Sequence, residues 1–81
     1  MQLAYRHLAL NGDTMNVAGR GIRVADIYAR YAQGEQPAEA ATAYGIPLAA
    51  VFEALAYAAD RPDEIQQVLS EDAQAYVPAK M

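Results

Sequence analysis

The chain has 81 residues, six basic and ten acidic side chains, a net charge of −4 and no cysteine. A chain of this length holds one hydrophobic core, so we expect a single domain over residues 1–81. The missing cysteines exclude disulfides and thiolate metal sites, and a single histidine cannot complete the usual zinc ligand sets. Because small domains without cross-links are often stabilised by association, we expect a homo-oligomer, in the simplest case a dimer.

Hydropathy also excludes classes of protein. No stretch approaches the roughly 18 uninterrupted apolar residues of a membrane span, and the N-terminus lacks the apolar run of a signal peptide. We therefore expect a cytoplasmic protein without a membrane partner. Alanine dominates the 54% hydrophobic content, which favours closely packed helices over a sheet-rich core.

The charges are unevenly distributed along the chain. Residues 1–34 carry four arginines against Asp13 and Asp26, a local balance of +2, whereas residues 35–59 and 60–81 each have a balance of −3. Nucleic-acid binding depends on neutralising phosphates, so residues 1–34 are the only region that could supply a DNA contact. The alternative is that these arginines are ordinary solvated side chains. The candidate DNA-binding residues are Arg6, Arg20, Arg23 and Arg30.

Residues 1–21 are expected to form a short β-hairpin or arm. Asn11-Gly12 is the dipeptide most typical of a tight type I′ turn, and the second strand would run from Asp13 to Val17. Met15 and Val17 would then share one face. Two strands alone are marginally stable, so the pairing could lie within one subunit or between two.

Residues 22–60 are expected to form a three-helix core, because apolar residues recur at intervals of three and four. The first helix opens near Val24 and ends at Gly34, and the second begins at Gln36-Pro37 and ends with Gly45 as its left-handed C-cap. The third opens at Pro47. The expected inward-facing residues are Val24, Ile27, Tyr28 and Tyr31, then Ala40, Ala41 and Tyr44, then Leu48, Val51, Phe52, Leu55 and either Ala58 or Ala59.

The spacing of Ala41, Gly45 and Val51 predicts a helix-turn-helix, with a small residue at the helix contact, a glycine at the turn and an anchoring valine. The first turns of the third helix would present Pro47, Ala49, Ala50 and Glu53 to a ligand. Of these side chains only Glu53 could hydrogen-bond a base. Two interpretations therefore stay open, a DNA-reading motif and a helical hairpin without sequence readout.

Residues 61–81 are expected to form a fourth, amphipathic helix followed by a tail that is loose after Asp72. The apolar stripe of this helix is Ile65, Val68 and Leu69. Three carboxylates near its start suit the positive end of the helix dipole, namely Asp60, Asp63 and Glu64. Such a segment could dock into a partner's groove or close the protein's own core, and for Ile65 the core is favoured. The candidate partner-binding residues are Arg61, Val68, Leu69, Tyr76 and Val77.

No phosphate-binding loop, nucleophile motif or metal-ligand spacing occurs, so we expect neither catalysis nor a cofactor. His7 has no serine, cysteine or clustered carboxylate near it in the sequence and is interpreted as a surface residue of a strand. The predicted fold is mainly α: a three-helix, helix-turn-helix-like bundle with a short N-terminal β-hairpin and an additional C-terminal helix.

Several segments together resemble the domain of unknown function 433 family. They are Gly19, Ile22 and Val24, then Asp26-Ile27, Gly34, the 37–44 helix and the run from Ala54 to Asp60. The resemblance covers residues from about 16 to 70 and implies a homeodomain-like helical fold. Members look like antitoxins of the VapB type, which implies a PIN-like ribonuclease as the partner.

Two functional hypotheses follow. In the first, the chain is an antitoxin-like dimer that neutralises a small PIN-like ribonuclease and represses its own promoter. In the second, it is a protein-interaction or oligomerisation module without DNA function, and the helix-turn-helix serves only as architecture. The acidic balance after residue 34 favours the second hypothesis, and the family resemblance favours the first.

Overall fold

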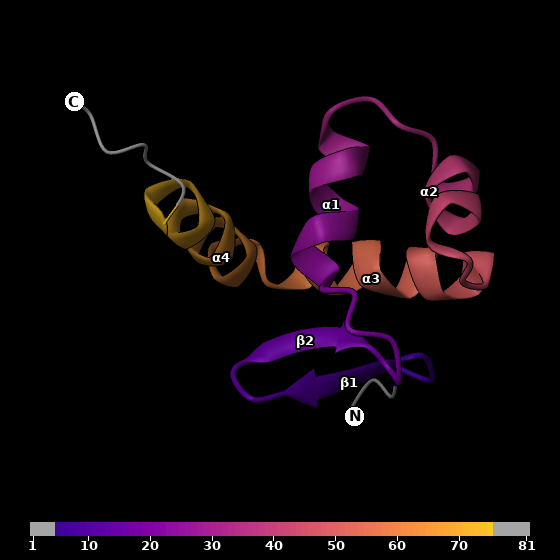
Figure 1. Cartoon of the computed structure of the whole chain (residues 1–81), viewed down its shortest axis with the longest axis horizontal. Coiled ribbons are helices and arrows are strands. Elements are labelled where there is room, and N and C mark those ends of the chain that lie inside the picture. The colour runs from indigo at the N-terminus through magenta and orange to yellow at the C-terminus, as the bar shows by residue number, and fades with distance from the viewer. Residues whose placement is uncertain (1–4, 76–81) are drawn as a thin grey trace.

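The computed structural model describes residues 5–75, in which a two-stranded hairpin precedes four helices (Figure 1). The strands are β1 (Leu8–Asn11) and β2 (Thr14–Val17), and the helices are α1 (Val24–Ala32), α2 (Pro37–Tyr44), α3 (Leu48–Asp60) and α4 (Pro62–Ala75). The predicted fold class is confirmed: the chain is mainly helical, with a short N-terminal hairpin and a helix after the three-helix core.

The hairpin closes with a different turn from the expected one. Asn11 pairs with Thr14, so the two-residue loop is Gly12-Asp13. Gly12 has a φ of 65°, but no non-glycine residue in the described part has a positive φ. The predicted type I′ turn is wrong, because that turn needs positive φ at both central residues. Met15 and Val17 share one face as expected, and the two strands pair within the chain.

The ends of α2 agree with the sequence signals. Pro37 occupies the first helical turn, and a capping box joins Gln36 and Glu39 at the N-terminus. Gly45 follows the helix in the left-handed conformation with a φ of 68°, as predicted. The sharp turn at Gly45 allows α3 to start at Leu48.

The inner side of α3 forms the centre of the core. Its buried residues are Ala50, Val51, Ala54, Tyr57 and Ala58. α1 and α2 pack against α3, and the hairpin contacts it from the opposite side (Figure 1). Val24 and Ile27 of α1 complete the core, each at most 1% exposed.

The expected inward positions of Leu48, Phe52 and Tyr31 are wrong. Their exposed fractions are 42%, 53% and 51%. The helical period alone does not fix which side of α3 faces inward. α1 and α2 approach α3 over its alanines, because small side chains permit close helix packing, and this turns Leu48 and Phe52 outward.

α4 extends away from the core, and the chain measures 47 × 29 × 22 Å (Figure 1). Ile65 is its only buried residue. The helix continues to Ala75, so the expected loose tail does not begin at Asp72. Within residues 5–75 no single helix is long and apolar enough to cross a membrane; α2 and α3 reach that length and apolarity only as a pair joined through a 118° bend.

Candidate functional site

The helix pair α2 and α3 has helix-turn-helix geometry. The two helices are bent by 118° relative to each other, within the range typical of the motif. Ala41 is buried at the contact, Gly45 makes the turn and Val51 is 1% exposed. The predicted roles of these three residues are confirmed.

The outward side of α3 is unlike a base-reading surface. It presents four exposed apolar residues, Leu48, Ala49, Phe52 and Ala56, called the α3 outer face below. None of these side chains can donate or accept a hydrogen bond to a base edge. Ala50, expected to be exposed here, is fully buried because it contacts the core.

Glu53 is the polar group of this helix nearest the outer face, and it is bound within the chain. Its carboxylate accepts hydrogen bonds from the His7 backbone N–H at 2.8 Å and from His7 Nδ1 at 2.7 Å. Both side chains are partly buried, at 21% and 32% exposure. His7 therefore joins the segment before β1 to α3, a role that its sequence position did not indicate.

Arg20 stabilises the turn of the helix-turn-helix. Its guanidinium donates to the carbonyl oxygens of Tyr44 and Gly45, each at 3.0 Å. These carbonyls end α2, where a cation also interacts favourably with the helix dipole. No carboxylate neutralises Arg20 within residues 5–75, and its side chain is exposed.

Arg23 and Arg30 are ion-paired. Arg23 binds Asp26 at 2.7 Å and Asp72 at 2.6 Å, which connects the start of α1 to α4. Arg30 binds Glu35 and lies 5.0 Å from the ring centre of Tyr44. The hydrogen bonds from these arginines lower the pKa values of Asp72 and Glu35. The positive charge of both arginines is thus largely neutralised inside the chain.

Arg6 differs from the other predicted DNA-binding residues. Its side chain is exposed and makes no hydrogen bond or ion pair with residues 5–75. It lies close enough to Glu53 to lower the pKa of that carboxyl electrostatically. The four predicted arginines therefore do not form one cluster with a common role.

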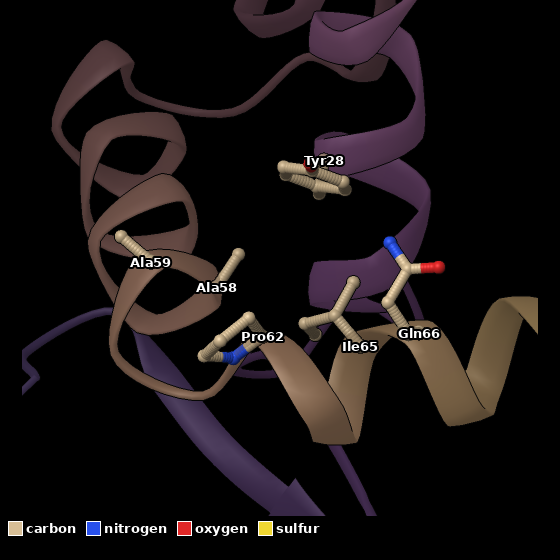
Figure 2. A pocket seen from close by; sticks show the side chains of 6 residues that line it. All are labelled: Tyr28, Ala58, Ala59, Pro62, Ile65 and Gln66. Atoms are coloured by element: carbon tan, nitrogen blue, oxygen red, sulfur yellow. The ribbon is translucent and has the colours of Figure 1, made fainter.

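An open apolar cleft lies where α1, α3 and α4 meet (Figure 2). Its volume is about 270 Å³. In Figure 2, Tyr28 of α1 faces Ile65 and Pro62 of α4 across the open space. The full lining is Tyr28, Ala58, Ala59, Pro62, Ile65 and Gln66. The helical spacing predicted Tyr28 only as a core residue, because the cleft depends on the direction in which α4 leaves α3.

None of the predicted partner-binding residues within residues 5–75 lines this cleft, and Val68 lines the hollow on the other side of α4. Val68 and Leu69 are half-buried on α4, and Arg61 is exposed at the α3–α4 junction. The Arg61 guanidinium lies 5.1 Å from the ring centre of Tyr57. Tyr76 and Val77 lie outside the described residues.

Tyr57 connects α3 to the first turn of α4. Its hydroxyl donates to both carboxylate oxygens of Glu64, at 2.9 and 2.8 Å. Burial and then this hydrogen bond raise the pKa of Tyr57 to about 12. Glu64 therefore has a structural partner in addition to its favourable place at the helix start.

A second hollow lies on the other side of α4, between that helix and the hairpin turn. Its volume is about 190 Å³, and its lining is Asp13, Thr14, Glu64, Gln67, Val68 and Glu71. Among residues 5–75 no group of three or more histidine, aspartate or glutamate side chains is arranged to hold a metal ion.

These features define a small helix-turn-helix domain with an apolar outer face on its third helix and an open cleft beside its fourth. The chain belongs to the family described as protein of unknown function, DUF433, whose model matches residues 11–58. The match runs from the hairpin turn through most of α3 and ends before α4. No curated protein and no solved structure matches the chain.

The His7–Glu53 contact predicts a pH dependence of stability. Burial raises the pKa of Glu53, but the hydrogen bonds from His7 outweigh this effect and leave the pKa below its ordinary value. A carboxyl whose pKa is lower in the folded state stabilises the fold above its unfolded-state pKa, and this contribution is lost as the pH falls through the lowered value.

We expect Glu53→Gln to lower the free energy of unfolding by about 1–2 kcal/mol at neutral pH, because it removes a charge-assisted hydrogen bond. The difference from the unmodified chain should shrink below about pH 4. Urea unfolding followed by circular dichroism, at neutral pH and in acid, measures the free energy of unfolding of both chains. Glu39→Gln is the control, since glutamine preserves the capping box. Equal stabilities at neutral pH, or a difference that persists in strong acid, would contradict this account.

Proposed function

We propose that the chain is an antitoxin-like protein that binds and inhibits a small PIN-like ribonuclease through the cleft and the adjoining face of α4. The observation that carries the proposal is the open apolar cleft, which the side chains of residues 5–75 leave unfilled. The class of partner follows from the resemblance to VapB-type antitoxins. The proposed activity is inhibition by binding in the cytoplasm, without catalysis.

The shape of the cleft supports a protein ligand. Hot spots of protein interfaces are commonly large apolar side chains inserted into pockets. A cleft of about 270 Å³ can receive one such side chain of the ribonuclease, which would contact Tyr28 and Ile65. Leu69, one turn after Ile65 and half-buried, extends the apolar surface along α4.

Arg61 gives the surface a cationic group. It is exposed immediately before Pro62, which lines the cleft, and its guanidinium lies over the Tyr57 ring. A PIN-like ribonuclease holds its metal with carboxylates, which attract a guanidinium. Under the proposal, Arg61 approaches that acidic site and disturbs metal binding there.

Gln66→Trp tests the cleft directly. The indole at this exposed lining position should occupy the cleft and exclude the partner, and we expect at least tenfold weaker binding to the PIN-like ribonuclease encoded beside this chain. Isothermal titration with the purified proteins measures the affinity. Co-expression measures protection of growth, which the variant should lose.

Gln67→Trp is the matched control, because the adjacent glutamine lines the other hollow of α4. This variant should bind like the unmodified chain, and circular dichroism should show the same fold for both. If the two variants bind the ribonuclease equally well, the cleft is not part of the interface. Absence of any complex between the unmodified proteins would overturn the proposed function itself.

Promoter binding is a second candidate function, favoured by the exposed side chains of Arg6 and Arg20, neither of which forms an ion pair with residues 5–75. The Arg20 guanidinium lies at the C-terminal end of α2, and the first helix of a helix-turn-helix crosses the DNA backbone. The apolar α3 outer face offers no base readout, so this binding would rest on phosphates. If it is absent, the chain is an interaction module without DNA function.

We expect Arg6→Ala combined with Arg20→Ala to weaken binding to upstream DNA and to reduce the slope of log affinity against log salt by about 2, one phosphate contact for each arginine. Arg23→Ala should leave the slope unchanged, because Asp26 and Asp72 already neutralise Arg23. Fluorescence anisotropy over a salt series measures the slope. No affinity at low salt, or an equal effect of Arg23→Ala, would exclude this role.

A further inference from the structure

The α3 outer face is an apolar surface that the described chain leaves uncovered. Phe52 is 53% exposed and Leu48 is 42% exposed. Ala49 and Ala56 are exposed beside them. None of these four residues lines the cleft beside α4, so the outer face is a separate surface from the site of the proposed function.

The outer face is also the uncharged part of an acidic molecule. Residues 40–52 contain no charged side chain, although the chain as a whole has a net charge of −4. The nearest charge on α3 is Glu53, which His7 holds through two hydrogen bonds. α4, in contrast, carries Asp63, Glu64, Glu71 and Asp72.

This distribution favours a second copy of the chain as the occupant of the face. In a symmetric dimer the same patch meets itself, so any charge on the patch faces its own copy. Like charges brought together across an interface cost several kcal/mol. Self-association through α4 would oppose carboxylates, whereas the α3 outer face brings no like charges together.

We propose that two copies of this chain bind each other through the α3 outer face, with their α3 helices antiparallel and Phe52 at the two-fold axis. Leu48 and Ala56 lie four residues on either side of Phe52. The axis therefore sets Leu48 of one copy against Ala56 of the other, a large side chain against a small one. Positions 48, 52 and 56 form an i±4 ridge, the ridge used in the commonest class of helix packing.

The expected dimer is weak. One helix face on each copy is smaller than the roughly 800 Å² per partner of a standard interface. Sedimentation velocity over a concentration series should therefore show a monomer–dimer equilibrium. Phe52→Ala should weaken the association at least tenfold.

Tyr31→Ala is the matched control, because Tyr31 is an equally exposed aromatic residue on α1. It should leave the equilibrium unchanged. A chain that stays monomeric at millimolar concentration contradicts the proposal, and so does a dimer that both substitutions affect equally or that neither affects. Since both side chains are exposed, the variants should keep the fold, which circular dichroism verifies.

A charge-pair experiment tests the register. Ala56→Glu should weaken the dimer, because it buries a carboxylate against Leu48 of the second copy. Adding Leu48→Lys to the same chain should restore association, since the two-fold axis pairs position 48 with position 56 across the interface. The two positions are eight residues apart in one helix, so they form no pair within a copy. Failure of this rescue would overturn the proposed register.

Discussion

The close packing of alanine-rich α3 against its neighbours is the constraint on which the rest of the structure depends. Ala50 and Ala54 are fully buried, and their small side chains let α1 and α2 approach the helix backbone. α4 and the hairpin contact the same helix. Because the contacts with α1 and α2 lie over the alanines, the large residues Leu48 and Phe52 face outward. The packing that forms the core therefore also creates the apolar outer face.

Three of the arginines make contacts that stabilise the fold. Arg20 caps the end of α2, while Arg23 connects α1 to α4 and Arg30 binds the segment before α2. Such contacts fix the turn and the direction of α4, which leaves less positive charge for nucleic acid. The molecule consequently offers apolar surfaces at α3 and beside α4, together with acidic side chains along α4. This combination suits protein partners better than DNA.

Local features were predictable from the sequence, and the orientation and pairing of the elements were not. Pro37 and Gly45 act within single turns, so the bounds of α2 and the helix-turn-helix followed from residue spacing. Which side of α3 faces inward depends on neighbours, and an alanine-rich helix has weak hydrophobic asymmetry, so Phe52 was misplaced. The His7–Glu53 contact joins residues 46 positions apart. A single sequence contains no signal for such a long-range contact. The cleft could not be predicted, because it depends on the direction of α4, and tertiary contacts set that direction.

Hydrogen–deuterium exchange of the chain, alone and mixed with the proposed PIN-like ribonuclease partner, tests the central claim most directly, because it reports every backbone region in one experiment. If the cleft beside α4 is the binding site, exchange should slow in α4 and in α1 near Tyr28, while the turn around Gly45 is unchanged. Slower exchange confined to that turn and the start of α3 would place the partner on the helix-turn-helix face and contradict the account.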